Sequence, residues 1–234
     1  MLRDRTYFLL RRLHSLTGII PAGVFLLAHL FINSGALLGE CQFTDGVRTI
    51  NSLPFLPYIE IFGILGPLAF HGALGLWMLV VQSKFNVGTY SYARNWWYVL
   101  QRITGFLVAA FLLWHLYDTW LAKQMGQLSL EEFYGHLGQG MSRGYFVVAM
   151  YTVGTIAASF HLANGLWGFL SSWGILQSRR AQRIGGWVFG LAGLALVIVW
   201  SNIIVHFASG GHNWLPVQEP PVPCGAEELR ALDD

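Results

Sequence analysis

Charged residues are scarce in this chain: they make up 11% of its 234 residues, whereas hydrophobic residues make up 54%. Soluble domains carry about 25% charged residues, so the composition excludes a water-soluble core. The net charge is only +2, and no basic patch with interleaved aromatic residues occurs, which excludes nucleic acid as a partner. The chain is therefore expected to lie mostly in a lipid bilayer.

Cysteine is almost absent, since Cys41 and Cys224 are the only two. No C-x-x-C-H motif occurs, which excludes the c-type cytochromes that this motif marks. No cysteine run for an iron–sulfur cluster and no glycine-rich dinucleotide fingerprint occur either. The two cysteines are either unrelated thiols or a disulfide between the C-terminal tail and the first outer loop, because both fall on the same predicted side.

Five apolar stretches approach the ~20 residues that cross the hydrocarbon core of a bilayer. We therefore predict an all-α integral membrane protein, with residues 1–208 as one five-helix domain and 209–234 as a proline-rich tail on the outer side. Turn-forming residues are expected to mark the connectors, including those at 33–35, 138–140 and 179–186. The predicted spans lie near 13–33, 58–82, 97–120, 145–172 and 186–208.

The distribution of lysine and arginine predicts the orientation, because cytoplasmic loops are enriched in both. Nine lie on one side of the predicted spans and four on the other, with Arg102 near a span start on the richer side. We therefore expect a cytoplasmic N-terminus and an external C-terminus. The richer side has Arg3, Arg5, Arg11, Arg12, Lys84, Arg94, Arg179, Arg180 and Arg183; the poorer side has Arg48, Lys123, Arg143 and Arg230.

Four histidines lie inside the spans, as matched pairs of an internal repeat. Residues 70–77 (FHGALGLW) reappear as residues 160–167 (FHLANGLW), so His71 matches His161. Ten residues separate the Thr17-Gly18 pair from His29, and nine separate the Thr104-Gly105 pair from His115. A charged side chain in hydrocarbon costs ~2.5–3.5 kcal/mol by insertion scales, so ionisable residues there indicate a function.

The repeat predicts which histidines share a depth in the membrane. The first and third spans run in the same direction, and the second and fourth run back, so equivalent residues lie at equal levels. At ~1.5 Å per residue, His29 and His115 lie ~24 and ~27 Å from the cytoplasmic span ends, and His71 and His161 lie ~17 Å from theirs. We call these the outer pair and the inner pair.

Each pair is expected to hold one haem iron through its two imidazoles. Two neutral imidazoles fill both axial positions and leave no open site, which favours electron transfer over oxygen chemistry. Copper or zinc is disfavoured because two ligands per level are too few for closed tetrahedral coordination. Small residues near the ligands fit a flat macrocycle, although they also permit close helix packing. These small residues are Ala28, Gly72, Gly75, Ala163 and Gly165.

Motifs in the loops and at the starts of helices, together with the ligand segments, resemble one family over roughly residues 7–208. This family is the dihaem cytochrome b membrane anchor of succinate dehydrogenase and fumarate reductase, in its single five-helix form. The motifs are residues 11–18 (RRLHSLTG), 51–55 (NSLPF), 90–96 (YSYARNW), 100–105 (LQRITG) and 160–167.

The resemblance implies a flavoprotein and an iron–sulfur protein docked on the cytoplasmic face of a bacterial membrane. Electrons from succinate would pass to the inner haem, to the outer haem and then to a quinone, with menaquinone preferred. Both haems would be noncovalently bound haem b. The resemblance leaves open the direction of the reaction and the assembly of complexes into dimers. The tail beyond residue 208 extends past the usual end of the family and has no assigned role.

Several polar residues are weaker candidates for site roles. Haem propionates at the inner edge need donors, and His14, Ser15 and Trp97 lie at cytoplasmic helix starts; interface anchoring explains Trp97 equally well. Quinone reduction needs protons near the outer haem, where Asp118 and Glu60 are candidates; the alternative is that both are hydrated interfacial carboxylates.

Two other functions remain open at the level of sequence. The first is a cytochrome b subunit of another respiratory oxidoreductase, such as a formate dehydrogenase or a hydrogenase. The second is a structural anchor or transporter without a cofactor. The remaining histidines, His136, His206 and His212, have no repeat mate and are not expected to bind iron.

Overall fold

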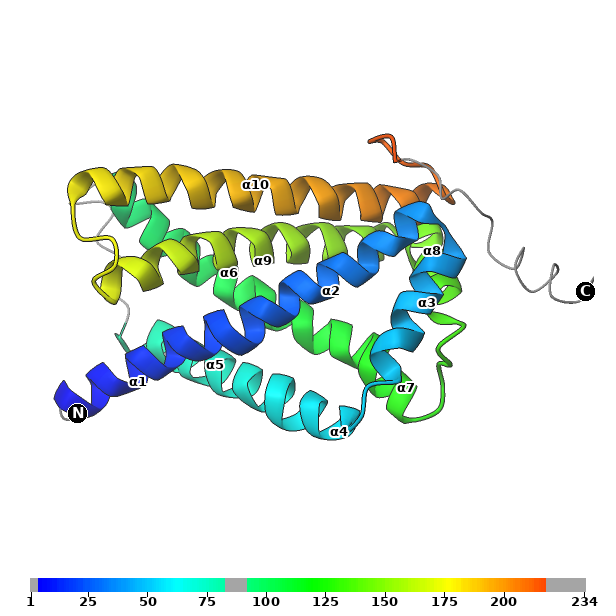
Figure 1. The fold of residues 1–234 in the computed structure, drawn as a ribbon, viewed down its shortest axis with the longest axis horizontal. Coiled ribbons are helices and arrows are strands. Elements are labelled where there is room, and N and C mark those ends of the chain that lie inside the picture. The colour runs from blue at the N-terminus through cyan, green and yellow to red at the C-terminus, as the bar shows by residue number, and fades with distance from the viewer. Residues whose placement is uncertain (1–3, 83–91, 218–234) are drawn as a thin grey trace, which may run out of the picture.

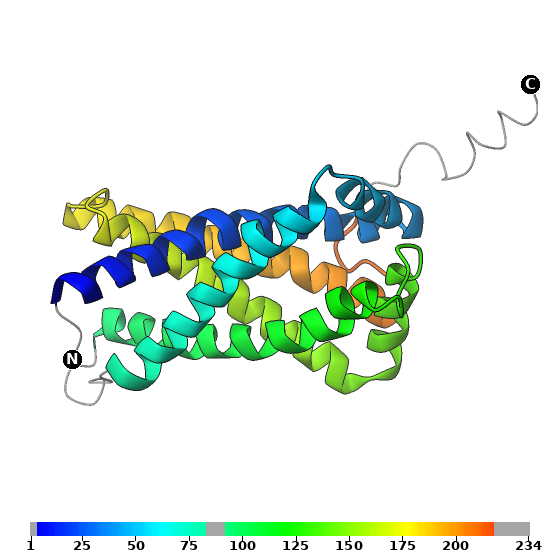
Figure 2. The same ribbon diagram turned by 90° about the horizontal axis from the view of Figure 1, so that it is seen from below.

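Five long helices lie side by side and alternate in direction in the computed structural model, which describes residues 4–82 and 92–217 (Figures 1 and 2). All five are long and apolar enough to cross a membrane, and no strand occurs in the described ranges, which confirms the predicted all-α fold. The spans run over Arg5–Leu38, Leu56–Val81, Ala93–Gln124, Tyr145–Ser172 and Arg179–Ser209.

The first three spans are each built from several helical segments. The first contains α1 (Asp4–Thr17), η1 (Gly18–Gly23), α2 (Val24–Ser34) and η2 (Gly35–Leu38). The second contains α4 (Leu56–Tyr58), η3 (Ile59–Leu65), α5 (Gly66–Trp77) and η4 (Met78–Gln82). The third contains α6 (Ala93–Leu116), η5 (Tyr117–Leu121) and α7 (Ala122–Gln124). The fourth and fifth are the single helices α9 (Tyr145–Ser172) and α10 (Arg179–Ser209).

Wide π-helical turns interrupt the first two spans close to their prolines. Pro21 lies inside η1, and Pro67 follows η3 at the start of α5. Proline has no N–H to donate, and its ring displaces the carbonyl one turn earlier, so the regular hydrogen-bond ladder cannot continue unchanged. Both spans nevertheless stay helical throughout, as the sequence analysis expected.

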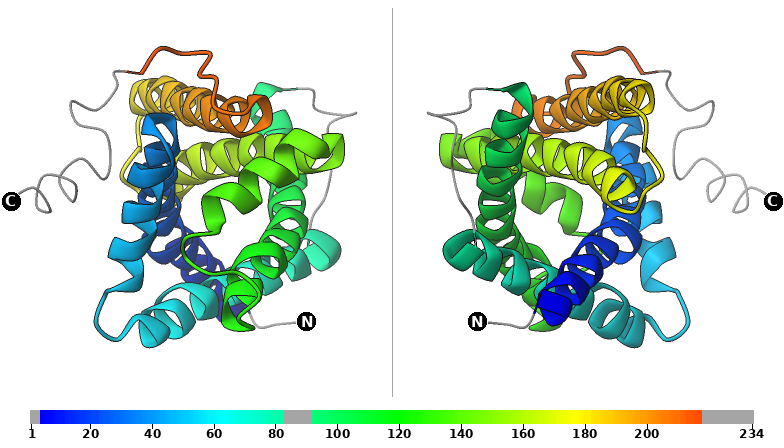
Figure 3. Two further views of the ribbon diagram at one scale, coloured as in Figure 1. Left: turned by 90° about the vertical axis from the view of Figure 1, so that its right-hand side faces the viewer. Right: turned by 90° about the vertical axis from the view of Figure 1, so that its left-hand side faces the viewer.

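The two ends of the bundle differ in character (Figure 1). One end holds the starts of α1, α6 and α10 with their arginines, and we call it the basic end. The other end carries two short helices outside the spans, α3 (Glu40–Asn51) and α8 (Phe133–Arg143), and we call it the capped end. Seen along the bundle, the spans surround a common centre (Figure 3).

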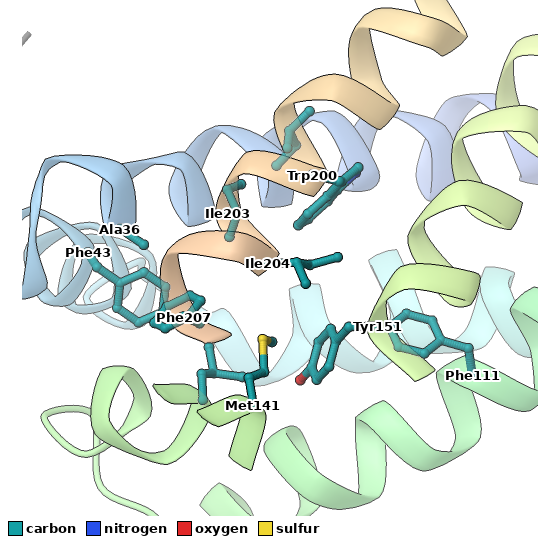
Figure 4. Close-up of a cluster of buried hydrophobic side chains, with 11 residues drawn as sticks. Ala36, Phe43, Phe111, Met141, Tyr151, Trp200, Ile203, Ile204 and Phe207 are labelled. Atoms are coloured by element: carbon teal, nitrogen blue, oxygen red, sulfur yellow. The ribbon is translucent and has the colours of Figure 1, made fainter. Parts of the chain in front are cut away.

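A buried aromatic cluster joins the short helices to the spans at the capped end (Figure 4). Phe43 of α3 packs edge-on against Phe207 of α10, with ring centroids 6.0 Å apart. Tyr134 of α8 also lies against Phe207, at 5.1 Å. Elsewhere large apolar side chains face outward, with Phe31 77% and Leu113 74% exposed, as expected for helices that contact lipid.

Three predicted connectors proved to be helical. The segment 179–186 starts α10, because the Ser178 hydroxyl accepts a hydrogen bond from the Ala181 N–H and caps the helix. Residues 138–140 lie inside α8 despite two glycines, since packing against α10 and α9 stabilises that helix. At 33–35 the first span continues to Leu38 and is broken only at Gly39, where φ is 122°.

Two local features fix the capped end further. Before α8, the Glu132 carboxylate accepts hydrogen bonds from the backbone N–H and the hydroxyl of Ser129, and these bonds lower the pKa of Glu132. Cys41, in α3, is disulfide-bonded. The only other cysteine in the sequence, Cys224, lies outside the described residues, as does most of the predicted tail.

Candidate haem-ligand site

The structure brings the four repeat histidines together as the two expected pairs. The ring centroids of His29 and His115 are 5.9 Å apart, and those of His71 and His161 are 6.1 Å apart. A metal between two imidazole nitrogens, with bonds of about 2.0–2.1 Å, requires centroids roughly 6 Å apart. This spacing would allow each pair to hold one iron between its two imidazoles.

Backbone carbonyls orient both rings of the inner pair in the same way. The Nδ1 atom of His71 lies 2.8 Å from the His14 carbonyl oxygen, and that of His161 lies 3.1 Å from the Gln101 carbonyl oxygen. A carbonyl only accepts, so each Nδ1 carries the proton and each Nε2 has a free lone pair. This is the tautomer that metal-binding histidines use.

The two carbonyls occupy equivalent positions of the repeat, because His14 and Gln101 each stand three residues before a Thr-Gly pair. The glycines of these pairs lie against the same rings. A Cβ on Gly18 would overlap the His71 ring, and one on Gly105 would lie 2.9 Å from Cε1 of His161. The internal repeat thus includes the contacts of His71 and His161 as well as the two histidines themselves.

His14, predicted as a propionate donor, lies directly beside the inner pair. Its ring stacks on His71, with centroids 4.0 Å apart and an interplanar angle of 8°. Its Nδ1 atom is buried and has no hydrogen-bond partner within the described part of the chain. An orphaned buried donor or acceptor of this kind costs about 1–3 kcal/mol, so it fits a site whose polar ligand completes the bonding.

The other two propionate candidates differ in their surroundings. The Ser15 hydroxyl donates to the Arg12 carbonyl at 2.9 Å and accepts from the Trp173 indole at 3.3 Å. Trp97 is about half exposed and stacks on Phe160, next to His161, with ring centroids 5.6 Å apart.

The outer pair has a different environment, made mostly of aromatic rings. Phe25 stacks on His29 at 5.4 Å, and Trp200 of α10 lies 6.1 Å from the same ring. His115 stacks on Phe111 at 5.4 Å. Its Nδ1 atom lies 3.2 Å from the Tyr151 hydroxyl, which is the hydrogen-bonding partner of this ring.

Both predicted proton carriers are held by polar partners at the capped end. Glu60 pairs with Lys123 at 3.1 Å and also accepts from the indole of Trp120 at 3.2 Å and the amide of Gln124 at 3.3 Å. The Lys123 ammonium donates as well to Asn51 at 3.0 Å. The carboxylate and ammonium are only 16% and 18% exposed, so they form a largely buried ion pair.

Asp118 has one partner and is more accessible. Its carboxylate lies 3.0 Å from Nε2 of His136 on α8, and each side chain is about one-third exposed. His136 has no repeat mate and was not expected to bind iron. Sequence reasoning missed this contact because α8 was not predicted as a helix.

Sequence reasoning also missed Gln101 and Asn164, which brace the fourth span against the third. The Gln101 amide donates to the His161 carbonyl at 3.0 Å, and Asn164 donates to the Gln101 side chain at 2.8 Å. Both lie within quoted motifs, at positions 100–105 and 160–167, so their motif membership was an available signal. Their polarity inside apolar spans was another.

The two imidazoles of each pair suit a metal cofactor that supplies its own equatorial ligands. Within residues 4–82 and 92–217, no three side chains of His, Cys, Asp or Glu gather as a metal-binding group. Each pair instead offers two imidazoles, which could hold a haem iron whose porphyrin supplies the remaining ligands.

Comparisons with known proteins agree with this geometry. The family described as "Succinate dehydrogenase/Fumarate reductase transmembrane subunit" matches residues 84–200. The succinate dehydrogenase cytochrome b558 subunit of Bacillus subtilis (strain 168) is 39% identical over 201 residues, which cover 86% of this chain and 96% of that protein. These matches favour the predicted family over the cytochromes of formate dehydrogenase or hydrogenase. The chain belongs to the family of succinate dehydrogenase and fumarate reductase transmembrane cytochrome b subunits.

Proposed function

We propose that this subunit carries electrons across the membrane between a cytoplasmic succinate dehydrogenase or fumarate reductase and a membrane quinone. Two haem b groups, when bound, supply one-electron redox chemistry at two depths. His71 and His161 would hold the inner haem, and His29 and His115 the outer haem. The other subunits would be a flavoprotein and an iron–sulfur protein docked at the basic end.

The observation that carries this proposal is the pairing of the four repeat histidines at centroid distances of 5.9 and 6.1 Å. The carbonyls behind His71 and His161 support it, because they leave both Nε2 atoms free to coordinate. In each pair the two rings come from different spans, so a ligated iron would also tie the helices together.

The buried Nδ1 atom of His14 supports a role for this residue at the inner haem edge. We propose that His14 and Ser15 donate to a propionate there, and that Trp97 closes the membrane-facing edge. Arg11, Arg12 and Arg102 belong to the same end of the bundle, where cations favour an anionic group.

We propose that quinone reacts near the outer haem, at the capped end. Asp118, with its one-third exposed partner His136, is the better placed of the two predicted proton carriers. Glu60 accepts from three donors, one of which is its ion-pair partner Lys123, and this favours a structural role for it. With menaquinone as the substrate, protons would come from the outer side.

The test is haem content in the assembled complex. Each of His71→Ala and His161→Ala should lose the same haem, and each of His29→Ala and His115→Ala should lose the other, so that purified protein retains about one haem per chain. His212→Ala, at an exposed position of the capped end, is the control and should retain both. Loss of spectroscopically different haems from His71→Ala and His161→Ala would disprove the pairing.

A further inference from the structure

The two halves of the repeat diverge at the contact behind the outer ligand. The inner ligands, His71 and His161, both donate to backbone carbonyls. His115 instead has the Tyr151 hydroxyl as its partner, at 3.2 Å. No hydrogen bond to the His29 ring occurs among the described residues, and the repeat position that matches Tyr151 is Ile61.

The phenol ring of Tyr151 is fixed by its neighbours. It is only 8% exposed and makes edge-on contacts with Phe111 at 5.5 Å and Trp114 at 5.4 Å. Figure 4 shows the Tyr151 ring next to Phe111, on the side of the buried cluster away from Phe43 and Phe207. Because these rings restrict its rotation, the hydroxyl is preorganised to meet Nδ1 of His115.

Ligation of iron fixes the direction of this hydrogen bond. An imidazole that coordinates through Nε2 carries its proton on Nδ1, so His115 would donate and the Tyr151 oxygen would accept. A donated hydrogen bond makes the ligand more basic, and this favours the more highly charged, oxidised iron. Because the acceptor is the Tyr151 side chain, a substitution at this position can change or remove it. A backbone carbonyl could take its place only with a change of fold.

We infer that Tyr151 is a positioning residue for His115 and sets the redox potential of the outer haem independently of the inner one. The inference rests on the proposed ligand role of His115. It assigns a function to the divergence of the repeat: the two haems receive different hydrogen bonds although their ligands are the same. The Tyr151 hydroxyl, which acts on the outer haem alone, would then bias electron transfer between the outer and inner haems.

The test is a redox titration of Tyr151→Phe in the assembled complex. The variant keeps the ring contacts and removes only the acceptor, so the ratio of reduced to oxidised outer haem at a fixed potential should rise about tenfold. For a one-electron couple this corresponds to a midpoint about 59 mV more positive. The inner haem should keep its midpoint, and the electron paramagnetic resonance signal of the outer haem alone should change.

Tyr134→Phe is the matched control. Tyr134 also lies at the capped end, and its hydroxyl is 2.8 Å from a ring nitrogen of His206, a histidine outside the repeat. This control should leave both midpoints unchanged. An unchanged outer midpoint in Tyr151→Phe, with the haem retained, would overturn the inference, as would an equal shift of the inner haem.

A second measurement covers the case in which Tyr151→Phe does not assemble. In the unmodified complex grown with ring-deuterated tyrosine, infrared difference spectra of outer-haem reduction should contain a tyrosine band that shifts with the label. Absence of such a band would overturn the inference. Retention of the outer haem in His115→Ala would instead disprove the proposed ligand role itself, so the two failures are distinguishable.

Discussion

Gly18 and Gly105 leave room for the imidazole rings of His71 and His161 because neither glycine has a Cβ atom. Each lies where an added Cβ would press on the imidazole of His71 or His161. The sequence marks both glycines through the repeated Thr-Gly pair, but only the folded chain shows that each faces a histidine of the next span.

We predict that Gly18→Ala and Gly105→Ala each lower the occupancy of the inner haem. The new methyl group forces the ring away from its carbonyl partner, and a displacement of about 1 Å is enough to spoil ligand geometry. The measurement is the haem-to-protein ratio, which should fall from two towards one. Gly168→Ala is the control, because no atom lies within 4 Å of its added Cβ. Full haem content in both ligand-facing variants would contradict the prediction.

The Glu60–Lys123 pair is expected to contribute to stability rather than to proton transfer. Removing one member of a largely buried pair leaves the other charge uncompensated, so Glu60→Ala should lower the free energy of unfolding by about 2 kcal/mol. Denaturation of the purified protein in detergent, followed by helical circular dichroism, measures this change. Lys123→Ala should give a loss of the same order.

An exposed ion pair between a glutamate and an arginine at the same end serves as the comparison. Arg48 and Glu131 lie 3.4 Å apart, and both side chains are more than half exposed. Water screens such pairs, so Glu131→Ala should cost only about 0.5 kcal/mol. Equal losses from Glu60→Ala and Glu131→Ala would show that burial does not matter here.

At the scale of elements, the C-terminal end of α10 is held by a buried amide. The Asn202 side chain is 2% exposed, and its oxygen accepts from the backbone N–H groups of Trp214 and Leu215 at 3.0 and 3.1 Å. The chain that follows α10 therefore folds back onto the helix. Next to it, His206 bonds to Tyr134 and to Asn213, both at 2.8 Å.

We predict that Asn202→Ala releases this returning segment. Two backbone N–H groups lose their acceptor, which should cost about 1–3 kcal/mol and speed proteolytic cleavage near residues 210–217. Limited proteolysis with mass detection of the fragments measures the effect. Ser201→Ala is the control, since its hydroxyl bonds only within its own helix, to Ile198. Identical cleavage rates in the two variants would rule out the proposed anchoring.

The existence of the five spans was predictable, whereas their segmentation was not. Length and hydropathy predict a span directly, because the bilayer sets the number of residues required. The helices α3 and α8 lie outside that constraint. They are stabilised by contacts such as Phe43 with Phe207, which join residues far apart in the chain.

For the whole molecule, the spans alternate so that the basic end and the capped end face opposite sides of the membrane. The rule for lysine and arginine predicts the basic end in the cytoplasm. Two exposed glutamines mark the two ends: Gln177 precedes α10 at the basic end, and Gln127 follows α7 at the capped end.

We predict that an impermeant thiol reagent labels Gln127→Cys on intact cells and labels Gln177→Cys only after lysis. The two variants are matched in residue type and exposure, and the unmodified chain, in which Cys41 is disulfide-bonded, gives the background labelling. Labelling is read by a gel shift. The opposite pattern would reverse the proposed orientation and would move the inner haem to the external side.

The sequence by itself determined the class of the protein, the number of spans and the pairing of the histidines. These depend on composition and on an internal repeat, and both can be recognised from the order of the residues alone. Only the tertiary structure decided which groups contact the rings of His71, His161 and His115: the carbonyls of His14 and Gln101, the hydroxyl of Tyr151 and the stacked ring of His14. The reason is physical, because hydrogen bonds and ring contacts between spans depend on helix rotation and depth to within about 1 Å, and side-chain packing sets both.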